Sequence, residues 1–93
     1  MVDTPGRITL WGLEVFLATA EEASITAAAR RLNVAPSSIS QQLPTLETAL
    51  GTGLLDRNAR PVSIKSAGET FLRRAYRFLH DAEVAQAELA MAG

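Results

Sequence analysis

The chain has 93 residues and no cysteine, so we expect one small domain with a thin core and exclude disulfides and thiolate metal sites. The apolar stretch 10–20 is interrupted by Glu14 and has no basic flank with a cleavage site, which argues against a signal peptide or a membrane span. The formal net charge is −1, but segment 24–65 has five basic residues against two acidic ones, and this local excess suits a nucleic-acid-binding face.

The N-terminal third predicts a loose arm and two helices. Residues 1–9 have no apolar period, which indicates an arm. Apolar residues recur at spacings of three and four over 10–23, as on one face of a helix. Ser24 is a suitable N-cap for a second helix over 25–32.

A third helix is predicted over 36–50, after a short turn at 33–35. Pro36 suits the first helical position and Gly51 the C-cap. Pro44 lies inside this helix and lacks an N–H, so we expect the helix to bend or loosen there and to continue through its packing. Its apolar stripe consists of Ile39, Leu43, Leu46 and Leu50.

The rest of the chain predicts a hairpin and a long helix. Two short strands are expected at 54–55 and 62–64, joined by a polar turn with two arginines. Ser66 is expected to cap a last helix over 67–91, which would be about 35 Å long. The fold class is therefore mostly α: a winged helix-turn-helix of three helices and a two-stranded wing over 10–65, followed by a linker helix over 66–93.

This order of elements favours DNA binding. In a helix-turn-helix the second helix of the motif enters the major groove and presents its N-terminal residues to base edges. Ser37, Ser40 and Gln41 occupy such positions here, and serine and glutamine can hydrogen-bond to bases. Arg57 and Arg60 on the wing could reach phosphates or a narrow minor groove. A solvated polar helix face and a soluble arginine-bearing turn would give the same pattern.

A set of short motifs is spread over residues 10–72. They lie at Phe16, Glu21–Ala29, Leu32, Val34, Ser40, Gln42, Leu46–Glu47, Leu50–Gly51, Leu54–Arg57 and Ala67–Gly68. None is decisive alone, but together they are specific, and they resemble the signature of LysR-type bacterial transcription regulators. The resemblance implies a winged helix-turn-helix, a linker helix that dimerises, and a larger effector-binding domain after it.

Pattern and resemblance together give a set of expected DNA-contacting residues. The resemblance implies phosphate contact at Thr26 and minor-groove contact at Arg60. The chain departs from the family's pattern at Ala35, Pro36 and Pro44, and Gly53 replaces a bulkier residue before the wing. The full expected set is Thr26, Arg31, Pro36, Ser37, Ser38, Ser40, Gln41, Thr45, Arg57, Arg60 and Lys65.

The last helix is expected to form a homodimer, or a tetramer in a full-length protein. Its apolar residues recur at spacings of four and three, as in a coiled-coil seam. The resemblance implies an antiparallel pair, and Phe71 and Leu72 have the alternative of packing on the first helix. The expected interface residues are Phe71, Leu72, Ala75, Phe78, Leu79, Ala82, Ala85 and Leu89.

We therefore expect sequence-specific binding of double-stranded DNA by part of a dimeric bacterial regulator in the cytoplasm. The alternative is a small helical interaction module without DNA binding, which Pro36, Pro44 and the near-neutral net charge would support. An enzyme is not expected, because the acidic residues and the sole histidine, His80, show no nucleophile, metal-ligand spacing or glycine-rich loop. No metal or cofactor is expected.

Overall fold

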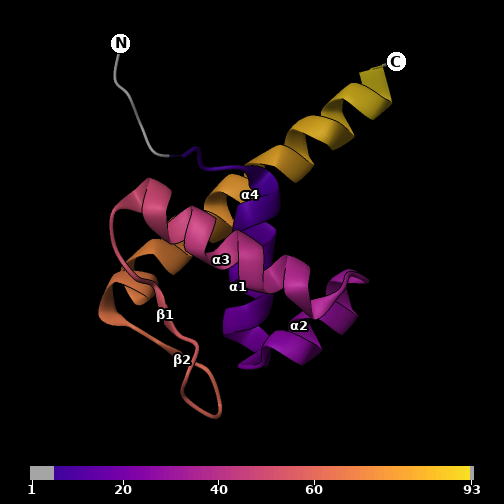
Figure 1. The fold of residues 1–93 in the computed structure, drawn as a ribbon. Helices are drawn as coiled ribbons and strands as arrows, with labels where there is room; N and C mark the ends of the chain where they lie inside the picture. Colours follow the sequence, from indigo (N-terminus) through magenta and orange to yellow (C-terminus); the bar gives the residue numbers. More distant parts are fainter. Residues whose placement is uncertain (1–5, 93) are drawn as a thin grey trace.

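The computed structural model describes residues 6–92, and four helices and a hairpin account for most of them (Figure 1). The expected mostly helical fold, with a two-stranded wing and a long last helix, is confirmed. The predicted arm 1–9 lies partly outside the described residues, and 6–9 have no regular structure. The elements are α1 (Leu10–Glu22), α2 (Ile25–Leu32), α3 (Pro36–Leu50), β1 (Leu55–Asp56), β2 (Ser63–Ile64) and α4 (Ser66–Ala92).

The helix boundaries follow from local capping. The Thr9 side chain accepts a hydrogen bond from the Gly12 N–H at 2.9 Å and starts α1. The expected cap of α2 is confirmed, since Ser24 Oγ accepts from the Ala27 N–H at 3.1 Å. Helix α1 ends at Glu22, one residue earlier than expected, because Ala23 adopts a left-handed conformation with φ of 55°.

Helix α3 begins at Pro36 and continues through Pro44 to Leu50, as expected. Packing offsets the hydrogen bond that Pro44 cannot make, since Leu43 and Leu46 on either side of it are buried. Gly51, with φ of 75°, ends the helix.

The core surrounds α1, which contacts α2, α3 and α4. Phe16 on α1 is fully buried and its ring lies 5.8 Å from that of Phe71 on α4, centroid to centroid. Ala28 and Ala29 are buried, so their small side chains let α2 approach closely. The other large, fully buried side chains are Leu13, Val15, Thr19, Ile39, Leu43 and Leu54.

Strand β1 lies one residue later than predicted and β2 is one residue shorter, because the first residue of each predicted strand bonds outside the hairpin. Glu47 Oε2 accepts from the Leu54 N–H at 2.6 Å, and the Ala23 carbonyl accepts from the Val62 N–H at 3.0 Å. The antiparallel register pairs Leu55 with Ile64 and Asp56 with Ser63. These contacts fasten the wing to α3 and to the turn between α1 and α2.

The start of α4 also differs from the prediction. Ser66 is its first residue rather than its cap, because the Lys65 carbonyl already accepts from the Glu69 N–H at 2.9 Å. Gly68 in the first turn is buried directly against the Leu54 carbonyl, where a Cβ atom would collide with backbone. Glycine at this position therefore lets α4 close over the wing.

We expect Gly68→Ala to destabilise the domain, since its Cβ would also lie 2.7 Å from Ile64 Cγ1. Overpacking of this kind lowers the free energy of unfolding by about 1–3 kcal/mol. Denaturant titration monitored by circular dichroism measures this change. Gly6→Ala is the control, because its Cβ would meet no atom closer than 3.7 Å. Equal stability of Gly68→Ala and the unsubstituted chain would contradict the close approach.

Candidate nucleic-acid interface

The outer face of α3 is polar and uncharged. Its apolar residues Ile39, Leu43 and Leu46 are buried on the opposite side. Figure 1 shows α3 crossing in front of α1 with no other element over it. The exposed residues of this face are Ser37, Ser40, Gln41, Pro44 and Thr45, and Ser38 is half-buried.

Hydrogen bonds within α3 already occupy some of these groups. Thr45 Oγ1 donates to the Gln41 carbonyl at 3.0 Å, so the Thr45 donor is engaged while its lone pairs stay accessible. The N-terminus of α3 has no side-chain cap, because Ala35 makes no side-chain hydrogen bond, and Pro36 has no N–H. Ser37, Ser40 and Gln41 are therefore the α3 side chains best placed to meet a ligand.

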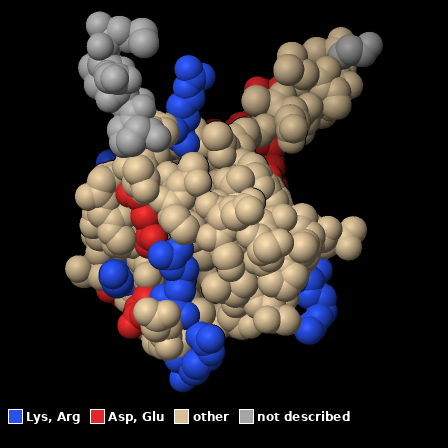
Figure 2. Space-filling view, in the orientation of Figure 1, with Lys and Arg blue, Asp and Glu red and all other residues tan. Residues whose placement is uncertain are grey.

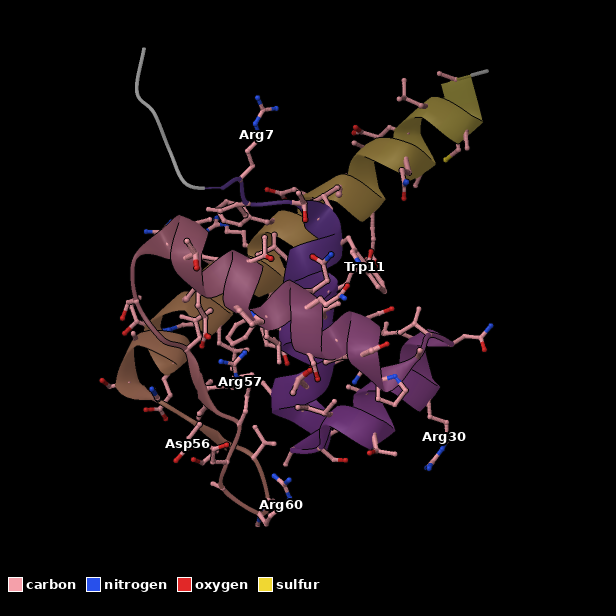
Figure 3. All side chains as sticks on the ribbon, viewed as in Figure 1. Arg7, Trp11, Arg30, Asp56, Arg57 and Arg60 are labelled. Carbon is pink, nitrogen blue, oxygen red and sulfur yellow. The ribbon has the colours of Figure 1, made fainter. Side chains whose placement is uncertain are left out.

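The wing brings Arg60 next to the start of α2. A shallow pocket lies between them, lined by Ser24, Thr26, Arg60 and Val62 among others. Arg60 is exposed at the tip of the wing (Figure 3), and its Nη1 donates to the Arg57 carbonyl at 3.0 Å. A cation beside the N-terminus of a helix is an arrangement that suits an anion such as phosphate.

Basic side chains lie around the margin of the α3 face. Figure 2 shows a largely uncharged central surface with lysine and arginine at its edges and acidic residues beside them on the left, and Figure 3 labels Arg7, Arg30 and Arg60 among the basic ones. Arg7 shares a pocket with Gln42 and Thr45 of α3. A polar face with cations on several sides of its margin suits a DNA groove between two phosphate backbones.

Arg7 and Arg30 were not among the sequence-predicted contacts. Arg7 was assigned to the arm, and only the folded chain places it beside α3. Arg30 could have been predicted as a DNA-contacting residue, since it follows Thr26 by four residues and so lies on the same face of α2.

Arg57 and Lys65 lie close to an acidic group. Arg57 Nη2 is 3.6 Å from Glu47 Oε1, and its side chain is partly buried. Lys65 is exposed, and its Nζ lies over Gly53 in the same region. The Glu47 carboxylate accepts from the backbone N–H groups of Leu54 and Leu55, so it holds the wing while it partly neutralises Arg57.

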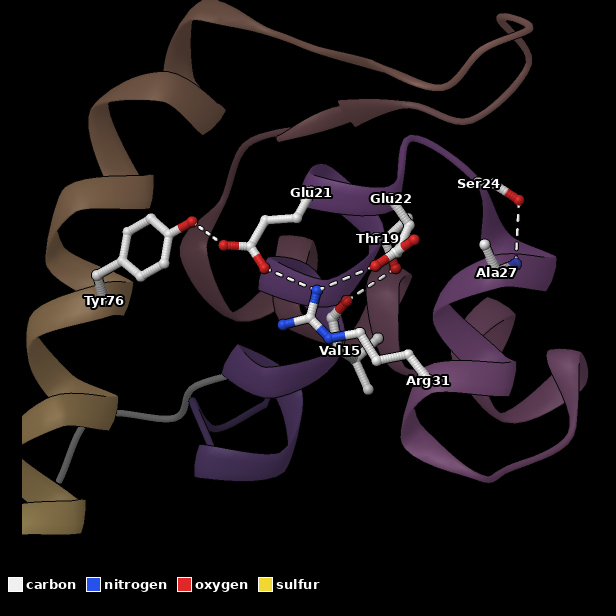
Figure 4. A network of polar contacts seen from close by, with 8 residues as sticks. All are labelled: Val15, Thr19, Glu21, Glu22, Ser24, Ala27, Arg31 and Tyr76. Carbon is white, nitrogen blue, oxygen red and sulfur yellow. Dashed lines mark hydrogen bonds and ion pairs between the residues drawn. The ribbon is translucent and has the colours of Figure 1, made fainter.

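Arg31 does not belong to this face, which corrects the sequence prediction. Its Nη1 lies 2.7 Å from Glu21 Oε1 and 3.3 Å from Glu22 Oε2, both at the end of α1 (Figure 4). The guanidinium is therefore committed to two carboxylates. The hydroxyl of Tyr76 on α4 donates to Glu21 Oε2.

This network shifts the titration of its members. The hydrogen bond from Tyr76, followed by that from Arg31, lowers the pKa of the Glu21 carboxyl. The same carboxylate raises the pKa of the Tyr76 hydroxyl and that of the Arg31 guanidinium. All three groups are thereby held in the states that attract one another at neutral pH.

The expected dimer seam is only partly available on α4. Ala75 is 0% exposed within its own domain, so it cannot contact another chain, and its prediction is wrong. Phe71 packs on Phe16. Three residues of the expected seam are half-buried against the core: Phe71, Leu72 and Leu79. The accessible positions of the seam are the half-buried Ala82 and the exposed Phe78, Ala85 and Leu89.

Phe78 is 45% exposed and Leu89 74%, and the distal part of α4 projects from the body of the domain (Figure 1). Among residues 6–92 no helix is long and apolar enough to cross a membrane.

Residues 10–69 match the family profile of the bacterial regulatory helix-turn-helix proteins of the lysR family. The chain belongs to the LysR family. The match covers α1, α2, α3, the wing and the first turn of α4, so it includes the polar face and its margin apart from Arg7.

LysR-family relatives include the HTH-type transcriptional regulator ClcR of Pseudomonas putida, which is 45% identical over 74 residues. The regulator BsdA of Bacillus subtilis is 40% identical over 78 residues. These alignments cover 80% and 83% of this chain, but only 25% and 27% of the relatives. The chain thus spans about a quarter of the length of the regulators it matches.

Solved structures of the family share the fold. The DNA-binding domain of CbnR in complex with DNA superposes with a TM-score of 0.85 at 35% identity, over 91% of this chain and 98% of that one. The DNA-binding domain of BenM in complex with benA site 1 DNA gives 0.85 at 32% identity, over 92% and 100%.

Proposed function

We propose that this chain binds double-stranded DNA sequence-specifically, as the DNA-binding part of a dimeric bacterial transcription regulator. The carrying observation is the exposed uncharged face of α3, bounded by Arg7, by Arg30 and by the pocket between Thr26 and Arg60. The structural similarity to the CbnR and BenM domains bound to DNA supports the same use of the fold.

The residues of the face divide into two roles. Ser37, Ser40 and Gln41 read base edges in the major groove, because their polar groups point away from the core near the start of α3. Thr26 and Arg60 bind the backbone or the minor groove from the far side of the same face. Ser38, Pro36 and Thr45 contribute shape, and Lys65 and Arg57 contribute charge behind the wing.

A dimer completes the proposal. The exposed apolar residues Phe78, Ala85 and Leu89, with Ala82, follow the spacings of four, three and four that a helix–helix seam requires. A second copy that covers them removes this apolar surface from water. Two-fold pairing then presents two α3 helices to two half-sites about one helical turn of DNA, or a multiple of it, apart.

The two roles predict different mutant phenotypes. Arg60→Ala is expected to weaken binding to all duplexes by about 1–3 kcal/mol and to reduce the slope of log K against log salt by about 0.9. Gln41→Ala is expected instead to relax the preference at one base pair. Fluorescence anisotropy with a panel of single-base variants of a selected duplex, at several salt concentrations, separates them.

Arg77→Ala is the matched control for Arg60→Ala, because it removes the same charge from the exposed surface of α4. Arg77→Ala should leave the salt slope close to that of the unsubstituted chain. An equal loss of affinity in Arg60→Ala and Arg77→Ala would mean that the wing makes no specific contact.

The seam predicts that Phe78→Asp disrupts self-association. Placing a charge on the one aromatic residue of this seam is expected to cost about 2 kcal/mol or more of association free energy, the size of an interface hot spot. Sedimentation equilibrium over a range of concentrations measures it. Ala87→Asp adds the same charge to an exposed position outside the seam, and it should leave association unchanged. A chain that sediments as a monomer before any substitution would refute the dimer.

A further inference from the structure

Tyr76 links α4 to the rest of the domain through two further helices. Its hydroxyl donates to Glu21 on α1, and Glu21 pairs in turn with Arg31 on α2 at 2.7 Å (Figure 4). We call these residues the three-helix cluster. Among residues 6–92, the bond between Tyr76 and Glu21 is the only side-chain hydrogen bond that joins α4 to another helix.

The cluster lies near the place where α4 leaves the body of the domain. Phe71 and Ala75, in the preceding turn, are held by apolar contact with the core. Beyond Ala82 every described residue of α4 is exposed. Leu79, one turn beyond Ala75, is the last of these residues packed on the core, so the directional bond from Tyr76 lies within the last packed turn before the helix projects.

A small rotation at this place moves the far end of α4 a long way. From Leu79 to Ala92 the helix is about 20 Å long, at a rise of about 1.5 Å per residue. A pivot of about 10° would displace that end by about 3.4 Å, which is the rise of about one base pair of DNA. Because α4 carries the proposed dimer seam, its exit angle determines how far apart two recognition helices stand.

We propose that Tyr76, Glu21 and Arg31 are positioning residues that fix the exit angle of α4, and thereby select the spacing between the two half-sites that a dimer binds. The inference rests on the proposed function. The spacing preference then depends on three residues that lie outside the α3 face and that hold α4 to its own domain.

The three-helix cluster determines the orientation of α4 more than it stabilises the folded domain. Its side chains are partly exposed, with Arg31 at 44% and Glu21 at 35%, and exposed ion pairs add little to folding stability. Removing one member should therefore leave the domain folded and its α3 face intact. What changes is the range of angles that α4 samples.

The chain supplies a matched pair of variants. Glu21→Gln removes the carboxylate that joins Tyr76 to Arg31. Glu22→Gln removes its neighbour, which lies 3.3 Å from Arg31 and makes no bond to α4. Both variants change the net charge equally, so electrostatic attraction to DNA is the same in both. Tyr76→Phe removes only the hydroxyl.

The first experiment selects duplexes from a random library with each protein and sequences them. The unsubstituted chain and Glu22→Gln are expected to select paired half-sites at one spacing. Glu21→Gln and Tyr76→Phe are expected to select the same half-sites at spacings that are shifted or spread by about one base pair or more, from the pivot above.

The outcomes are distinguishable. If all four proteins select one common spacing, the cluster does not set it and the inference is overturned. If the unsubstituted chain selects single half-sites without a partner, there is no spacing to set and the inference is equally overturned. If it selects no sequence at all, the proposed function fails first.

A second experiment tests the angle without DNA. The chain has no cysteine, so single cysteines at Thr48 on α3 and Ala87 on α4 allow a pair of spin labels. Dilution in unlabelled chain restricts the measured distance to one subunit. The distance distribution is expected to widen in Tyr76→Phe and Glu21→Gln and to stay narrow in Glu22→Gln. Identical distributions in all variants, with unchanged circular dichroism, would overturn the inference.

Discussion

The burial of α1 is the constraint on which the other elements depend. Phe16 and Leu13 lie at its centre, and α2, α3 and α4 each pack against it. Removing a side chain such as Phe16 from water stabilises the fold by about 1.5–3 kcal/mol, so each helix turns its apolar stripe inward. Once Ile39, Leu43 and Leu46 of α3 are committed to this contact, the face of α3 that remains outside is polar. The site is thus a consequence of the core.

The wing depends on a second set of contacts, between backbone groups and one carboxylate. Two paired residues per strand cannot hold a hairpin alone. Glu47 binds the N–H groups of Leu54 and Leu55, and Val62 donates to the Ala23 carbonyl at the turn before α2. These bonds connect the wing to α3 at one end and to the start of α2 at the other. They bring Arg60 next to Thr26, which is far from it in sequence.

Periodicity and local capping were enough to predict the helices. The start of α2 at Ser24 and the end of α3 at Gly51 each depend on a bond or a backbone angle within a few residues. The polar residues of α3 were also predictable, because the apolar stripe determines which side faces out. The first wing residues were mispredicted because Leu54 and Val62 bond to partners in other elements.

The same distinction accounts for the misassigned side chains. Arg31 looked like a free cation, but its partners Glu21 and Glu22 lie on another helix and come within reach only after α1 and α2 pack. Ala75 fitted the spacing of a dimer seam, but at that turn of α4 the core of its own domain already buries the apolar side chain. A spacing rule identifies which residues share a face, and tertiary packing decides which neighbour covers it.

The most direct test of the account is a titration of the isotopically labelled chain with a duplex of arbitrary sequence at low salt, followed by amide chemical shifts. Even non-specific binding, with dissociation constants of about 1–100 μM at physiological salt and tighter below it, is measurable in this way. The account predicts that shifts concentrate on Ser37 to Gln41, on Thr26 and on Arg60, and weaken as salt is added. Shifts that are absent, or that are confined to α4, would contradict DNA binding through the α3 face and the wing.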